Sequence, residues 1–281
     1  MRPALVMFAF VLLASALCGA SASECAETQP AERPHRKTPD VVRPWILVGL
    51  SPRGCVGGCR KVFSVIRDLS GNRKGIIVPF RKLTPELVME MEPEFIVLSP
   101  QGTPWCRYSG DDAVALQNML WTIPLLAEEM NVPILGICGG HQALALAFGG
   151  KVGPIRAVED DCLPYTRTRR KGLLPLERTV QDPIFHGLPR GLLVRASHYD
   201  EVKQVPPGFV VLASHRVSPI QIMRHPTRPV YGIQGHPEYF RPGCPDGGVL
   251  IRNFLQIARS HNEAVRRLAS SGSIESTTSS R

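Results

Sequence analysis

Short, continuous apolar runs alternate with helical patterns along the first half of the chain. The apolar runs are typical of strands buried on both faces, and they lie at residues 45–50, 75–80, 94–99 and 132–137. Helical patterns lie at residues 61–69, 111–131 and 142–148, and Pro124 should end or kink the second of them. This alternation predicts an α/β fold with an open, mostly parallel sheet and helices on both faces.

The second half of the chain has shorter, hairpin-like strand patterns. They lie at residues 192–195, 209–213, 221–224 and 230–234, before a closing helical pattern at residues 249–258. Residues 23–43 are polar and Pro-rich and predict a flexible linker, whereas the polar residues 261–281 predict a disordered tail. We therefore expect one folded domain over residues 44–260.

The amino terminus has the pattern of a secretory signal peptide over residues 1–22. Arg2 precedes an uncharged apolar run at residues 4–17, and Ala-Ser-Ala at residues 20–22 has the pattern of a cleavage site. The run is short for a permanent membrane helix, which makes an uncleaved anchor the less favoured alternative. We expect cleavage near Ala22, a secreted or periplasmic protein, and no stable membrane span afterwards.

Composition narrows the class of protein and of partner. Hydrophobic residues make up 43% and charged residues 20% of the 281 residues, which favours a globular protein over a disordered one. The formal net charge of +9 suits an anionic partner. The basic cluster at residues 33–37 is more typical of a solvated segment than of a nucleic-acid site, and we expect no nucleic-acid partner.

Cysteine content bears on the redox setting. Of eight cysteines, Cys18 belongs to the signal segment, which leaves an odd number in an exported chain. At least one thiol should then stay free in an oxidising compartment. The sequence does not decide how the others pair; apart from Cys138 they are Cys25, Cys55, Cys59, Cys106, Cys162 and Cys244. No histidine stands near Cys55 and Cys59, and we expect no metal site.

The sequence G-I-C-G-G at residues 136–140 has the form of a nucleophile elbow. It directly follows an apolar strand pattern and precedes a helical one, and glycines two residues to either side of the cysteine avoid collisions in the tight turn. The helix amino terminus favours a thiolate and offers free N–H groups. Cys138 is therefore the candidate nucleophile, and the N–H of Gly139 a candidate oxyanion donor. From this motif alone, a buried cysteine in a Gly-rich turn is the alternative.

A second motif, Q-G-H-P-E at residues 234–238, follows the last strand pattern. A thiol nucleophile needs a base, and the base needs an acceptor that orients it. Residues i and i+2 of an extended chain point the same way, so His236 and Glu238 are placed to address one site. Together with the cysteine elbow, this motif predicts a Cys-His-Glu triad.

With these motifs, the chain resembles the class I glutamine amidotransferases over residues 45–258. Its stretch at residues 95–104 is similar to the family's loop after the third strand, which supplies a second oxyanion N–H. Its S-H-Y-D-E-V segment at residues 197–202 is similar to the guanosine monophosphate synthetase glutaminase domain, although Gly235 replaces a phenylalanine that is common before H-P-E. The resemblance implies a flavodoxin-like sheet. It also implies a catalytic triad of Cys138, His236 and Glu238. The oxyanion hole would be formed by Gly139 and Gly102. The substrate contacts would come from Gln142, Ser197 and His198.

The reaction that the resemblance implies is hydrolysis of the γ-carboxamide of glutamine. A cysteinyl thioester forms, ammonia leaves, and water releases glutamate, with no metal or organic cofactor. Residues 45–258 leave no room for a second catalytic domain, so a synthase that uses the ammonia would be a separate partner. Two alternatives stay open: a secreted γ-glutamyl peptidase or amide hydrolase of the same superfamily, and a catalytically silent binding module.

Overall fold

The computed structural model describes residues 43–155 and 170–278, with side chains over residues 43–155 and 171–271. The expected signal peptide at residues 1–22 and all but the last residue of the expected linker at residues 23–43 lie outside the described residues. Cys25 and Cys162 also lie outside them. No helix among the described residues has both the length and the apolar character needed to cross a membrane.

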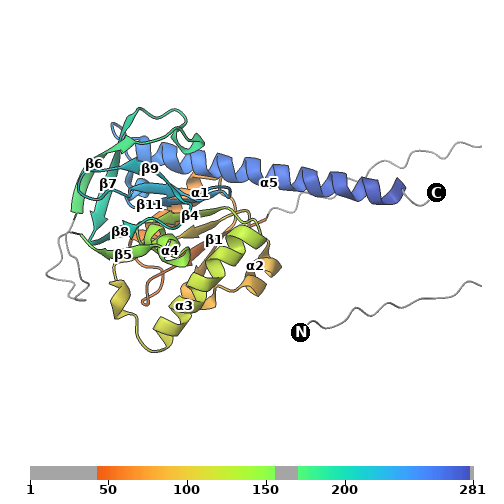
Figure 1. The fold of residues 1–281 in the computed structure, drawn as a ribbon, viewed down its shortest axis with the longest axis horizontal. Helices are drawn as coiled ribbons and strands as arrows, with labels where there is room; N and C mark the ends of the chain where they lie inside the picture. Colours follow the sequence, from red (N-terminus) through yellow and green to blue (C-terminus); the bar gives the residue numbers. More distant parts are fainter. Residues whose placement is uncertain (1–42, 156–169, 279–281) are drawn as a thin grey trace, which may run out of the picture. The chain divides into compact units, whose positions relative to one another are not determined.

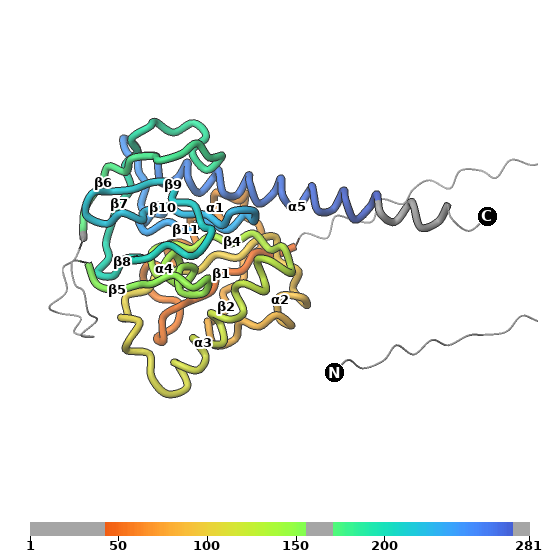
Figure 2. The backbone as a smooth tube through the Cα atoms, in the orientation of Figure 1, coloured from red at the N-terminus to blue at the C-terminus, as the bar shows by residue number. Residues whose placement is uncertain are grey.

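A nine-stranded sheet forms the centre of the described fold (Figure 1). Its parallel half has the strand order β2 (Gly75–Pro79), β1 (Trp45–Gly49), β3 (Ile96–Leu98), β4 (Ile134–Ile137) and β11 (Val230–Ile233). The antiparallel half continues with β10 (Ile222–Arg224), β9 (Val210–Ser214), β6 (Arg170–Arg178) and β7 (Gly191–His198), as the tube in Figure 2 shows. A separate antiparallel pair consists of β5 (Lys151–Pro154) and β8 (Asp200–Gln204).

Alternation along each parallel strand places buried side chains in two separate cores. Trp45 and Leu47 pack in the core with α1 (Gly58–Leu69) and α5 (Asp246–Thr278). Ile46 and Val48 pack on the opposite face, in the core with α2 (Pro85–Met91), α3 (Asp111–Pro124) and α4 (Gly139–Ala147). Figure 1 shows α5 on one side of these strands, and α3 and α2 on the other. The predicted α/β fold with helices on both faces is confirmed.

Helix boundaries follow the local chemistry. The helical pattern predicted over residues 111–131 is α3, which ends at Pro124, followed by a π-helical segment at Leu125–Glu129. Proline has no N–H to donate, so the α-helical hydrogen-bond ladder changes there. The patterns did not predict α2, β5, β6 or β8.

Helix α5 corrects one prediction. Disorder was expected from residue 261, but the helix continues through residues 261–271 and its described backbone reaches Thr278. Two side chains in this segment bind other elements: His261 Nε2 lies 3.0 Å from the carbonyl oxygen of Asn131, and Asn262 Nδ2 donates to that of Glu94 over 2.8 Å. These tertiary contacts stabilise a segment whose polar composition alone predicts disorder.

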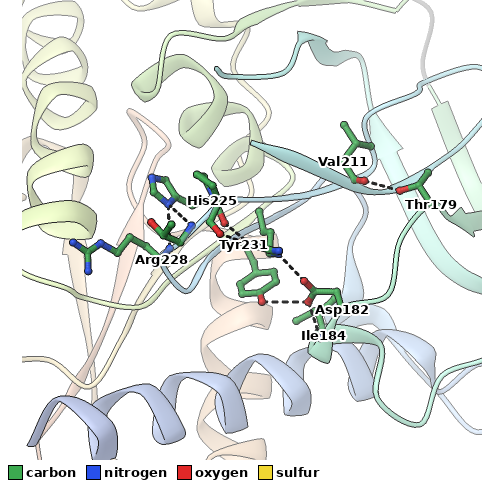
Figure 3. Close-up of polar contacts among 10 residues, drawn as sticks. Thr179, Asp182, Ile184, Val211, His225, Arg228 and Tyr231 are labelled. Carbon is green, nitrogen blue, oxygen red and sulfur yellow. Dashed lines mark hydrogen bonds and ion pairs between the residues drawn. The ribbon is translucent and has the colours of Figure 1, made fainter. Parts of the chain in front are cut away.

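A buried carboxylate joins the two halves of the large sheet. Asp182 lies in the connection between β6 and β7 and accepts hydrogen bonds from the Ile184 N–H and the Tyr231 hydroxyl, at 2.9 and 3.2 Å (Figure 3). Arg224 Nε of β10 donates to its other oxygen over 2.7 Å. Because Tyr231 belongs to β11, Asp182 also fixes the strand that leads into Q-G-H-P-E.

Candidate active site

Cys138 lies at the turn between β4 and α4, where the elbow was predicted. Its backbone has φ 51° and ψ −101°, in a region that side chains other than glycine rarely adopt. The turn is held at both ends: the Cys138 N–H donates to the carbonyl of Ile233 over 2.8 Å, and the Gln142 N–H donates to the carbonyl of Cys138 over 3.1 Å. The sulfur is therefore presented at a fixed position beside the end of β11.

The flanking glycines are required by close backbone approaches. A Cβ added to Gly136 would lie 2.4 Å from the carbonyl oxygen of Gly140. A Cβ on Gly140 would lie 2.2 Å from the carbonyl oxygen of Leu98 in β3. Both distances are too short for non-bonded atoms, so a side chain on Gly136 would push α4 away from β4, and one on Gly140 would push the elbow away from β3.

His236 and Glu238 form the predicted pair. His236 Nδ1 lies 2.8 Å from Glu238 Oε1, and the Glu238 side chain has no exposed surface. The His236 N–H donates to the carbonyl of Arg195 over 2.6 Å, which fixes the backbone of the base. The local geometry differs from the extended chain that was expected, because residues Pro237–Tyr239 form a short 3-10 turn.

The charge state of His236 is set by its neighbours. Burial lowers its pKa, but interactions with the Cys138 sulfur and the Glu238 carboxylate raise it more strongly, so that the pKa lies at about 11. The imidazole is therefore protonated at neutral pH. His236 Nε2 makes no aligned hydrogen bond among the described residues, and the Cys138 thiol is free of any disulfide.

His141 also follows the elbow closely, but it is not suited to act as a base. Complete burial lowers its pKa to about 3, so it stays neutral at physiological pH. Its Nε2 lies 3.2 Å from the carbonyl oxygen of Ile220, and the ring packs where a side chain on Gly232 would otherwise lie. The environments of the two histidines therefore single out His236.

A cleft of about 720 Å³ opens at the carboxyl ends of the parallel strands, beside Cys138. Most of the residues predicted for the site line it: Gly102, Cys138, Gln142, Ser197, His198 and His236. Glu238 lies behind His236, and its carboxylate reaches the site through the imidazole. Ligands of open α/β sheets bind at this edge, so the position agrees with a substrate site.

The oxyanion loop lies directly against Gly139. A Cβ added to Gly139 would lie 2.9 Å from the backbone nitrogen of Gln101, whereas one added to Gly102 would meet nothing within 4 Å. Gln101 is therefore the loop residue whose backbone packs on the elbow, and Gly102 lines the cleft beside it. The oxyanion roles of Gly139 and Gly102 stay predictions.

Gln142 is held by two side chains and one backbone carbonyl around the cleft. Its Oε1 accepts from Trp105 Nε1 over 2.8 Å, and its Nε2 donates to the carbonyl of Asp200 and to Gln234 Oε1, at 2.7 and 3.2 Å. Both amide hydrogens are thus engaged within the protein. The Gln142 side chain thus holds the wall of the cleft in place. The substrate contacts expected from Gln142, Ser197 and His198 stay predictions.

Gln234 is a site residue to which the sequence reasoning gave no role. It is fully buried, and its Nε2 lies 3.9 Å from the Cys138 sulfur as a donor. The signal was present, because Gln234 precedes His236 by two positions, the same spacing that linked His236 to Glu238. Trp105 gave no such signal, since only the fold brings it to Gln142.

The described cysteines are divided between disulfides and free thiols. Cys55 and Cys59 form a disulfide at the start of α1, and Cys106 is also disulfide-bonded. Cys138 and Cys244 are free and buried. Among the described residues, no group of three or more histidine, cysteine or acidic side chains is arranged to hold a metal ion.

An open α/β sheet with a cysteine at a strand–helix elbow, and with a buried His-Glu pair beside it, defines a cysteine-dependent amidohydrolase of the triad class. The family model for "Glutamine amidotransferase class-I" matches residues 64–258. The chain belongs to this family.

Curated relatives and solved structures agree with this assignment. A glutamine-hydrolyzing GMP synthase subunit from Thermococcus kodakarensis is 37% identical over 198 residues, which cover 70% of this chain and 91% of the relative. The Pyrococcus abyssi protein of the same name is 40% identical over 172 residues, 61% of this chain and 79% of the relative.

Among solved structures, a putative GMP synthase subunit from Thermoplasma acidophilum has a TM-score of 0.62 and 26% identity, covering 80% of this chain and 98% of that one. A Thermotoga maritima glutamine amidotransferase, at a TM-score of 0.57 and 16% identity over 77% of this chain and 98% of its own, shares the fold.

Proposed function

We propose that the protein hydrolyses the side-chain amide of glutamine and releases ammonia and glutamate. The observation that carries the proposal is the placement of a free cysteine at the elbow beside His236. The neighbours of this histidine raise its pKa, and Glu238 orients its ring. The relatives named above are glutamine-hydrolysing enzymes, which supports the choice of amide. They give no support to the γ-glutamyl peptidase alternative.

The geometry suggests the order of bond changes. The Cys138 thiolate attacks the amide carbon, and the developing oxyanion faces the backbone N–H groups of Gly139 and the 100–102 loop. The imidazolium of His236 gives its proton to the amide nitrogen, the C–N bond breaks, and ammonia leaves a thioester behind. His236 then takes a proton from water, the resulting hydroxide attacks the thioester, and glutamate leaves as the thiolate is restored.

The destination of the ammonia is proposed from the relatives. Their names describe one subunit of GMP synthase, and the described residues of this chain are occupied by the amidotransferase fold. We therefore propose that this protein supplies ammonia to a separate synthase, rather than using it within the same domain.

Export of the protein is also a proposal. The signal-peptide pattern at residues 1–22 is the first observation in its favour. The disulfide between Cys55 and Cys59, with Cys106 also disulfide-bonded, is the second, because disulfides persist mainly in oxidising compartments. Amino-terminal sequencing of the protein recovered from culture medium, periplasm and cytosol tests this proposal; protein found only in the cytosol, with residue 1 intact, would contradict it.

The proposed activity is tested by labelling and by turnover. A glutamine-derived diazoketone should alkylate Cys138, mapped by mass spectrometry, and spare Cys244, the other free thiol in the part of the chain that the structure describes. Cys138→Ala should lower ammonia release from glutamine by about a thousandfold or more while the melting temperature changes little. Retained turnover in that variant, or labelling confined to Cys244, would remove Cys138 as the nucleophile.

A further inference from the structure

A second, smaller pocket of about 290 Å³ adjoins the catalytic cleft on the side of the antiparallel strands. Lys171 from the start of β6 and Arg195 from β7 line one part of it. Arg241 and Tyr239, which follow the catalytic histidine in the chain, line the other. The function proposed above makes no use of Lys171 or Arg241.

The pocket has a one-sided charge. Among the residues that the structure describes, its lining contains three cations, Lys171, Arg195 and Arg241, and no acidic residue. None of the three forms an ion pair among the residues that the structure describes. Cations gathered around a concave surface raise the local concentration of anions, and a guanidinium presents a planar fork that fits a carboxylate or a phosphate.

The cations are carried by backbone segments that are fixed to one another. Arg241 and Cys244 form a β-bridge, with hydrogen bonds of 3.2 and 2.9 Å in the two directions. The Cys244 thiol lies 3.8 Å from the carbonyl oxygen of Leu193, and the Leu193 N–H donates to Asp246 over 2.8 Å. The loop that carries Arg241 is thus attached to the strand that carries Arg195. A site on fixed elements loses little entropy when it binds a ligand.

The pocket shares a wall with the catalytic cleft. Arg195 and Tyr239 line both. The Arg195 guanidinium lies 4.9 Å from the centre of the Tyr239 ring, and that ring lies 5.9 Å from the imidazole of His236. A ligand in the pocket would therefore lie beside the Arg195–Tyr239 pair, which borders His236.

We propose that this basic pocket binds the carboxylate or phosphate group of a small molecule. The group belongs to a separate ligand that occupies the pocket while glutamine is cleaved, because the leaving group of glutamine is ammonia and carries no anion. Binding itself does not depend on the function proposed above, whereas the effect of the anion on catalysis rests on it.

Binding is measured with inorganic phosphate and with citrate, by calorimetry at low ionic strength on the full chain carrying Cys138→Ala. We expect saturable binding at one site, weakened about tenfold or more by Arg241→Met and by Lys171→Met, because each removes a charge-assisted hydrogen bond. Arg252→Met removes an exposed charge from α5, outside the lining of the pocket, and should leave the affinity unchanged. Equal affinities in Arg241→Met, Lys171→Met and their parent, or no binding in the parent, would overturn the proposal.

The source of the anion is assigned with the active enzyme. Cleavage of γ-glutamylglutamate with a higher kcat/KM than the same compound amidated at both leaving-side carboxyls, with the preference lost in Arg241→Met, would show that the anion is part of the substrate and would overturn the proposal of a separate ligand. A separate ligand predicts that phosphate changes the kinetics of glutamine in the parent but not in Arg241→Met. If phosphate binds as expected but no amide is cleaved, the pocket proposal stands and the proposed function fails.

Discussion

Cys138 and Cys244 are both free and buried, yet their surroundings differ in chemistry. The Cys244 thiol lies 3.8 Å from the carbonyl oxygen of Leu193, a neutral acceptor. Cys138 lies at the start of a helix, and its sulfur accepts a hydrogen bond from the side-chain amide of Gln234. It also lies beside His236 and raises the pKa of that imidazole. Reactive cysteines are found in surroundings that stabilise the thiolate, and burial alone does not distinguish the two.

Glu238→Gln should lower kcat at neutral pH by about a hundredfold, with a smaller change in KM, because the amide orients the imidazole poorly and carries no charge. The carboxylate raises the pKa of His236, so its removal should lower that pKa. Activity requires the proton on His236 and falls as pH rises through its pKa. The alkaline limb of the kcat/KM profile should therefore move to lower pH.

The matched control is Glu263→Gln, which changes an exposed glutamate on α5 in the same way and should leave the profile unchanged. An effect of Glu238→Gln on KM alone, or an alkaline limb that stays in place, would contradict the orienting role.

At the scale of elements, the site depends on how closely the backbones of β3, β4 and α4 approach. Gly140→Ala should destabilise the protein by about 2 kcal/mol, since its Cβ would overlap the carbonyl oxygen of Leu98. It should also lower the rate of labelling of Cys138, because the elbow must shift to relieve the overlap. Urea unfolding measures the first effect, and mass spectrometry of the alkylated peptide measures the second.

Gly191→Ala provides the comparison, because a Cβ at Gly191 would meet nothing within 4 Å. Its free energy of unfolding should change by no more than about 0.5 kcal/mol. Equal stability of the two alanine variants would show that the elbow accommodates a side chain, contrary to the close packing described above.

The departure at Gly235 also has an explanation at this scale. A Cβ there would lie 2.5 Å from Val194 Cγ1 and 3.1 Å from the carbonyl oxygen of Arg195. Strand β7 therefore occupies the space that a phenylalanine would need before H-P-E. A larger residue at position 235 would therefore fit only if β7 moved. The sequence around position 235 does not reveal this constraint.

Prediction of individual elements succeeded where the pattern was local. Strands β1 and β4 are buried on both faces, and their continuous apolar runs reveal it. Strand β6, in contrast, reads R-K-G-L-L-P-L-E-R and resembles a basic loop. It becomes a strand because it pairs with β7 along its length and with β9 at its end, contacts that its own residues do not encode.

At the scale of the whole molecule, Asp182 couples the antiparallel half of the sheet to the catalytic strand. Its side chain is 2% exposed, whereas that of its partner Arg224 is 28% exposed. Asp182→Ala should lower the free energy of unfolding by about 3 kcal/mol, because a mostly buried guanidinium and the Tyr231 hydroxyl would lose their acceptor. Urea unfolding measures the loss. Asp68→Ala, which removes an exposed pair on α1, should change the stability by less than about 1 kcal/mol, and a similar loss in both variants would contradict the coupling.

The sequence by itself determined the alternation of strands and helices, the cysteine elbow and the His-Glu spacing. These are properties of residues close together in the chain, where periodicity and the conformational freedom of glycine act directly. Only the tertiary structure decided that β11 lies beside β4 and brings His236 to Cys138. The same holds for the sulfur contact of Gln234, the continuation of α5 as a helix, and the gathering of Lys171, Arg195 and Arg241 around one pocket. Those features depend on side chains from distant segments meeting in space, and such meetings are fixed by packing over the whole fold.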